Sequence, residues 1–129
     1  MLLLKSRIFW AQLIVVLMVS GIHFIASARN LYDLIWWIDI PQHFLGGLWV
    51  GLACLWLFAV ARRPIPGLLT LFLMVFAIGI AWEIYEYVFG ISYGPMYVYD
   101  TAKDLLMDCV GALCAYAIAT QFLLKDKNI

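Results

Sequence analysis

The sequence predicts an all-α, polytopic membrane protein in which four transmembrane helices form one bundle. Of its 129 residues, 67% are hydrophobic and 12% are charged, whereas soluble domains average about 45–50% apolar and about 25% charged residues. The length suits a single membrane domain over residues 1–129. Basic and acidic residues cancel to a formal net charge of zero, so no overall field attracts phosphate backbones and a nucleic-acid partner is not expected.

The predicted spans share a nearly uninterrupted apolar character and the length, roughly 20 residues, that a bilayer requires. They run over about residues 8–26, 40–61, 68–89 and 102–124. A basic, proline-containing turn at 62–67 and a loop around Gly94 separate neighbouring spans. The first stretch has a second interpretation, because a basic start followed by Ala26-Ser27-Ala28 is typical of a cleaved signal peptide. Its apolar run exceeds the usual length, about 7–15 residues, of a signal peptide, which favours an uncleaved anchor.

A short helix in the membrane interface is expected over residues 31–39, because its apolar side chains share one face beside Trp36 and Trp37. The basic residues predict the orientation of the bundle, since Lys and Arg concentrate on the cytoplasmic side. Two basic residues, Arg29 and Lys103, lie on one side. The other six lie on the side that holds both termini, which is therefore predicted to be cytoplasmic: Lys5, Arg7, Arg62, Arg63, Lys125 and Lys127.

Acidic residues gather on the opposite, outer side. Both histidines, His23 and His43, are also near outer ends of spans, and of the eight acidic residues only Asp126 lies on the cytoplasmic side. The other seven are Asp33, Asp39, Glu83, Glu86, Asp100, Asp104 and Asp108. An ionisable group one turn or more inside a span costs at least a few kcal/mol unless it is paired or faces a polar cavity. This concentration therefore indicates a functional site.

Helical spacing brings these groups together. Residues three or four apart lie on one helix face, and small residues continue each acidic face, as expected where helices contact one another in lipid. The rows are Asp39 with His43, Glu83 with Glu86, and Asp100 with Asp104 and Asp108. We therefore expect the carboxylates to meet at the outer mouth of the bundle. The step from Gly47 to Gly51 offers a further contact face, through which a homo-oligomer could form.

Several carboxylates in a low dielectric cannot all ionise without a countercharge. A divalent cation, a shared proton, or an internal cation such as Lys103 would each neutralise some of them. The candidate metal ligands are Asp39, His43, Glu83, Glu86, Asp100, Asp104 and Asp108. The candidate catalytic residues are His43, Glu83 and Asp104. Structural roles are the alternative, with Asp39 capping a helix that has Pro41 in its first turn and His43 serving only as a hydrogen-bonded interface residue.

Three classes of function follow from this arrangement. The first is a membrane protein that binds a divalent cation, or a lipid or envelope-precursor headgroup, and acts by metal-assisted or acid–base chemistry. The second is a small oligomeric transporter subunit. The inner halves of the spans lack ionisable residues, which is evidence against this class. The third is a non-catalytic assembly partner. The three cysteines form no C-x-x-C pair, and buried cysteines commonly behave as small hydrophobes.

Three segments resemble the YjdF-like family of bacterial inner-membrane proteins. The segment from Asp39 to Gly47 resembles its D-x-x-x-H-F-x-x-G element, 82–87 its E-x-x-E element, and 99–112 its D-T-x-x-D element. A looser resemblance extends to VanZ-like proteins, a group linked to glycopeptide-antibiotic resistance. The resemblance implies a multi-pass protein of the bacterial inner membrane but no particular activity. The motif positions that it implies are Asp39, His43, Glu83, Glu86, Asp100 and Asp104.

Overall fold

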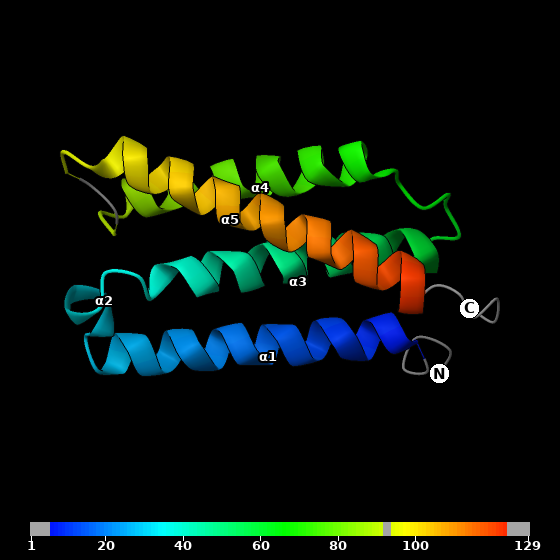
Figure 1. The fold of residues 1–129 in the computed structure, drawn as a ribbon, viewed down its shortest axis with the longest axis horizontal. Coiled ribbons are helices and arrows are strands. Elements are labelled where there is room, and N and C mark those ends of the chain that lie inside the picture. Colours follow the sequence, from blue (N-terminus) through cyan, green and yellow to red (C-terminus); the bar gives the residue numbers. More distant parts are fainter. Residues whose placement is uncertain (1–5, 92–93, 124–129) are drawn as a thin grey trace.

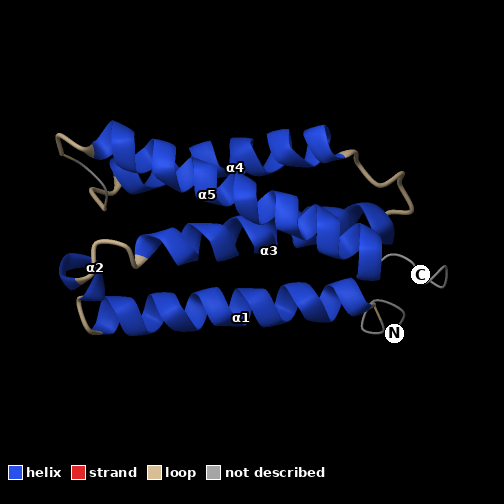
Figure 2. Ribbon diagram, viewed as in Figure 1, coloured by secondary structure: helices blue, strands red, loops and turns tan. Residues whose placement is uncertain are grey.

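The computed structural model describes residues 6–91 and 94–123, and this part of the chain is mostly helical, with turns and short non-helical segments between the helices and no strand. Figures 1 and 2 show the long helices running side by side. The elements are α1 (Arg7–Ala28), α2 (Leu31–Leu34), α3 (Asp39–Val60), α4 (Leu68–Val88), α5 (Tyr97–Ile118) and a π-helical turn, η2 (Ala119–Leu123). The prediction of an all-α fold is confirmed.

The helices α1, α3 and α4 are long and apolar enough to cross a membrane. Each begins and ends within two residues of the span predicted from the sequence. The fourth predicted span falls on α5, which has 22 residues, carries the acidic row and is not among the described helices that are apolar enough to qualify as a span. It begins at Tyr97, five residues before the predicted start at 102.

The helix expected over residues 31–39 is shorter than predicted. The helix α2 ends at Leu34, and residues 36–38 form a turn instead of continuing it. The cause lies in the backbone, since Ile35 is extended, with φ −127° and ψ 94°. At the other end Asn30 adopts the left-handed conformation, with φ 52°, which asparagine tolerates better than most residues. These two breaks let the chain turn sharply between α1 and α3.

The helix α3 lies at the centre of the bundle, with α1 along one side and α5 crossing it on the other (Figure 1). Close approach to α5 depends on glycine. A Cβ atom on Gly47 would overlap the backbone of Asp108, and one on Gly51 would lie 2.7 Å from Cβ of Ala115. The prediction that Gly47 and Gly51 join two copies of the chain is therefore wrong, because α5 of the same chain already covers this face.

Candidate functional site at the acidic end of the bundle

One end of the bundle, here called the acidic end, is where α1 and α4 end and α3 and α5 begin (Figure 1). The alternating direction of the helices brings together the predicted acidic rows, which are far apart in the sequence. Four of the candidate residues are almost fully buried there: His43 (8% exposed), Glu83 (3%), Asp104 (2%) and Asp108 (7%). The other three, Asp39, Glu86 and Asp100, are half-buried. The predicted convergence of the acidic rows at one end of the bundle is confirmed, and the orientation of that end toward the outer side of a membrane stays a prediction.

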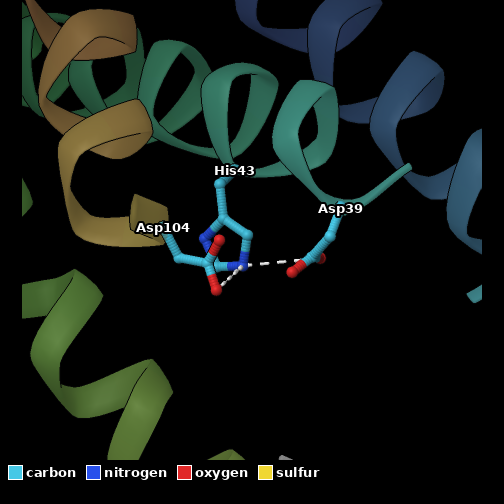
Figure 3. Close-up of side chains that lie close together, drawn as sticks. All are labelled: Asp39, His43 and Asp104. Carbon is cyan, nitrogen blue, oxygen red and sulfur yellow. Dashed lines mark ion pairs between the residues drawn. The ribbon is translucent and has the colours of Figure 1, made fainter. Parts of the chain in front are cut away.

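The imidazole of His43 lies between carboxylates on both of its edges. Its Nε2 atom is 3.6 Å from Asp39 Oδ1 and 3.8 Å from Asp104 Oδ2 (Figure 3). On the opposite edge, Nδ1 is 3.4 Å from Asp108 Oδ1. The first turn of α3 places Asp39 and His43 on one face, and α5 supplies the other two carboxylates.

The spacing around Nε2 suits a shared cation better than direct hydrogen bonds. An N–H···O bond has a donor–acceptor distance of about 2.7–3.2 Å, which is shorter than both the 3.6 and 3.8 Å separations. Two ligand atoms that are each about 2.1 Å from a tetrahedral ion stand about 3.4 Å apart. One ligand atom from each of Asp39, His43 and Asp104 lies within 4.8 Å of the others. A small movement of these side chains would therefore bring all three onto one ion.

Asp39 does not cap α3, so the capping alternative is wrong. The residue at the N-cap position is Ile38, no side-chain cap bond is present, and Asp39 is the first helical residue. Its carboxylate is consequently available to face His43. Its side chain is 33% exposed, which makes it the most accessible of the three residues around Nε2.

Asp108 lies apart from this group of three. Its Oδ1 faces Nδ1 of His43, and a Cβ atom on Gly79 of α4 would lie 2.7 Å from its Oδ2. The carboxylate therefore occupies the space that the missing side chain of Gly79 leaves between α3, α4 and α5. Histidines that bind metals commonly hold their second ring nitrogen against a carboxylate in this way.

The internal cation predicted from the sequence is present. Lys103 Nζ donates to Asp100 Oδ1 at 2.6 Å and lies 3.6 Å from Asp104 Oδ1. Asp104 Oδ1 is buried and receives no hydrogen bond from the described residues. Lys103 therefore compensates mainly Asp100, which leaves Asp104 free to share its charge with an ion.

Glu83 and Glu86 form a separate pair on α4. Thr101 of α5 donates its hydroxyl to Glu83 Oε2 at 2.8 Å, and Trp82 donates Nε1–H to Glu86 Oε1 at 2.9 Å. Glu83 Oε1 is buried and accepts no hydrogen bond from the described residues. Among the candidate catalytic residues, His43 and Asp104 therefore face each other across the space beside Nε2 of His43. Glu83 lies outside this space and bonds to Thr101.

A hydrogen-bonded link beside the site was not predicted. The Tyr32 hydroxyl of α2 lies 2.7 Å from His23 Nδ1 of α1 and accepts a bond from Gln42 Nε2 of α3 at 2.5 Å. Burial raises the pKa of Tyr32, the bond from Gln42 opposes this, and the nearby Asp39 and Glu86 carboxylates raise the pKa further. The sequence carries no spacing signal for this link, because it joins residues of three different elements.

Comparison with known proteins gives one family match. No curated protein and no solved structure matches the chain. The family described as "Predicted membrane protein (DUF2238)" matches residues 4–125, which include all of the candidate site residues. The chain therefore belongs to the DUF2238 family of predicted membrane proteins.

Proposed function

We propose that this protein binds a divalent cation through Asp39 Oδ1, His43 Nε2 and Asp104 Oδ2. The observation that carries the proposal is the position of Nε2, 3.6 and 3.8 Å from two carboxylates of different helices. Among the described residues, the one lysine near these acids already pairs with Asp100. A bound cation would supply positive charge beside the buried Asp104 carboxylate, which cannot be compensated by water.

The donor set favours a transition metal such as Zn²⁺. One imidazole nitrogen and two carboxylate oxygens are ligands that Zn²⁺ accepts, whereas Mg²⁺ and Ca²⁺ prefer oxygen alone. Three protein ligands leave a coordination position open, as in catalytic rather than structural zinc sites. The exposed side of Asp39 is the side from which a lipid or envelope-precursor headgroup would approach that position. Metal-assisted chemistry on such a headgroup is the reaction class that this geometry supports best.

The proposed setting is a bacterial inner membrane with four spans and both termini in the cytoplasm. The basic residues Arg7, Arg62 and Arg63 are at the end opposite the acidic one, where α1 begins and α3 ends. The helix α5 qualifies as the fourth span in this proposal because Asp104 and Asp108 are buried against the bundle instead of facing lipid. The resemblance to YjdF-like and VanZ-like proteins supports the same setting.

A transport pathway has less support. The buried side chains that α3 and α4 contribute to the half away from the acidic end carry no ionisable carboxylate, imidazole or amine: Leu52, Cys54, Leu55, Leu71 and Val75. The helix α1 adds one buried polar residue, Gln12. A pathway for ions or polar solutes needs polar groups or water along its whole depth. The acidic end therefore fits a binding site better than the entrance to a channel.

Isothermal titration of the detergent-purified protein with Zn²⁺, after removal of bound metal with EDTA, tests this function. We expect about one Zn²⁺ per chain, and loss of that binding in Asp104→Asn. The matched control is Asp33→Asn, which neutralises an exposed acid on α2 and should leave binding unchanged. Equal Zn²⁺ binding by the wild type and Asp104→Asn, or no binding by either, would overturn the proposal.

A further inference from the structure

The Glu83–Glu86 pair has a geometry of its own. The two residues are three apart on α4 and therefore share a face. Each carboxylate has one oxygen fixed by a neutral donor, Thr101 for Glu83 and Trp82 for Glu86. The second oxygen of Glu83 is buried and unpartnered among the described residues. Glu86 is half-buried and lies nearer the acidic end of α4, so that a ligand entering from that end meets Glu86 first.

The pair carries acidic charge for which the described residues supply no ion-pairing partner. Lys103 pairs with Asp100 and Asp104, and His43 faces Asp39, Asp104 and Asp108. One divalent cation at the proposed metal site would offset Asp39 and Asp104 and leave Glu83 and Glu86 uncompensated. A buried carboxylate oxygen without a donor is unfavourable, so a ligand that brings both a positive charge and N–H donors would be stabilised here.

We propose that Glu83 and Glu86 form a second subsite, which binds the primary ammonium group of a membrane-lipid headgroup. A second metal ion fits less well, because only two carboxylates are present and the side chains beside them, Thr101 and Trp82, are already donating to those carboxylates. An ammonium group has three N–H donors and no fixed coordination geometry. It can bond to the half-buried Glu86 directly and to Glu83 Oε1 once the side chains that cover this buried oxygen rotate away, while the two existing hydrogen bonds stay in place.

The neighbouring surface indicates a lipid as the source of the ammonium group. Trp82, Tyr85 and Phe89 are 50%, 44% and 67% exposed, and their rings are in sequential contact, with centroids 5.3 and 4.6 Å apart. Aromatic side chains at the end of a membrane helix sit at headgroup level, and their ring faces attract cations. Because Trp82 also bonds to Glu86, this aromatic surface leads directly from the lipid to the carboxylate pair.

This inference rests on the acidic end facing a membrane surface and does not depend on metal binding. The experiment is native mass spectrometry of the protein released from nanodiscs with EDTA present throughout. The nanodiscs contain phosphatidylglycerol with equal parts of phosphatidylethanolamine or phosphatidylcholine. We expect the wild type to retain phosphatidylethanolamine at least about tenfold more than phosphatidylcholine, whose quaternary ammonium has no N–H. The variant Glu83→Gln/Glu86→Gln should lose this preference, and Asp33→Asn should keep it.

Two further measurements keep the result decisive. Circular dichroism and size-exclusion elution establish whether Glu83→Gln/Glu86→Gln is folded. If the double variant does not fold, the single variant Glu86→Gln, which changes the half-buried position, replaces it in the lipid experiment. Competition with free ethanolamine distinguishes the lipid from a soluble amine, and we expect no displacement at millimolar concentration. Unchanged lipid preference in the folded variant, or full displacement by free ethanolamine, would overturn the inference. Because EDTA removes metal, failure of the metal site would leave this result intact.

Discussion

His43 and Asp108 contact each other through the ring nitrogen that points away from the proposed metal site. Nδ1 of His43 lies 3.4 Å from Asp108 Oδ1, while Nε2 faces Asp39 and Asp104. This separation is longer than a hydrogen bond, but a carboxylate beside one ring nitrogen favours the tautomer with the proton on that nitrogen and leaves the other nitrogen free to bind a metal. Asp108 therefore acts as a positioning residue for His43 in the proposed site, although it is one turn of α5 from Asp104.

Replacing Asp108 with Asn should weaken Zn²⁺ binding without abolishing it. The amide is nearly isosteric but lacks the charge that holds the Nδ1–H tautomer, so we expect the affinity to fall by about 10–100-fold. Isothermal titration measures the affinity, and the ¹⁵N chemical shifts of the His43 ring report its tautomer in the metal-free protein. Wild-type affinity together with an unchanged tautomer would contradict the positioning role.

Gly79→Ala should affect the site more than the fold. The new Cβ would lie 2.7 Å from Asp108 Oδ2 and 2.9 Å from Leu105 Cδ2, and both atoms are ends of side chains that can rotate away. Displacing the Asp108 carboxylate should lower Zn²⁺ affinity by about tenfold, in the range seen when supporting residues are altered. The cost to the free energy of unfolding should stay near 1 kcal/mol, at the low end for overpacking. A large fall in Tm with unchanged Zn²⁺ affinity would show that Gly79 supports the fold and not the position of the Asp108 carboxylate.

Gly47→Ala should affect the stability of the fold more than the site. A Cβ atom there would overlap backbone atoms of Asp108, which cannot move unless α3 and α5 separate. We expect a loss of about 3 kcal/mol or more in the free energy of unfolding, at the upper end for overpacked sites, measured by thermal unfolding in detergent. The matched control is Gly21→Ala on α1, where a Cβ meets nothing within 4 Å. If both variants have the wild-type Tm, the close packing of α3 on α5 described here is wrong.

Lys103→Met should strengthen Zn²⁺ binding. Lys103 Nζ lies 3.6 Å from Asp104 Oδ1 and competes with a metal for the same negative charge. Removing a partly exposed charge at this distance is worth about 1 kcal/mol, so we expect roughly a fivefold increase in affinity by isothermal titration. A decrease would mean that Lys103 holds Asp104 in its binding position instead of competing for it.

Much of this arrangement follows from helical periodicity. The bounds of three spans, and the convergence of the rows that contain His43, Glu83 and Asp104, depend only on local spacing and on the alternating direction of successive helices. Periodicity places Asp104 and Asp108 on the same face of α5 but cannot tell which of them meets Nε2 of His43. That distinction depends on the rotation of α5 against α3, which close packing at glycine sets.

Other features could not be predicted, because they also depend on contacts between elements and not on local spacing. A G-x-x-x-G step predicts a helix contact without identifying the partner helix, so the pattern at Gly47 and Gly51 is compatible with the interior of the bundle and with another copy of the chain. The early end of α2 depends on the extended backbone at Ile35, which no turn residue marks. The link from Tyr32 to Gln42 joins two elements through a single hydroxyl, and no periodic pattern records such a contact.

The most direct test of the central claim is an anomalous difference map at the zinc absorption edge, from crystals of the protein grown with Zn²⁺. We predict one peak within about 2.0–2.2 Å of Asp39 Oδ1, His43 Nε2 and Asp104 Oδ2, with Asp108 still against Nδ1 of His43. A map with no peak at these three residues under saturating Zn²⁺, or a peak bound only by other residues, would contradict the account.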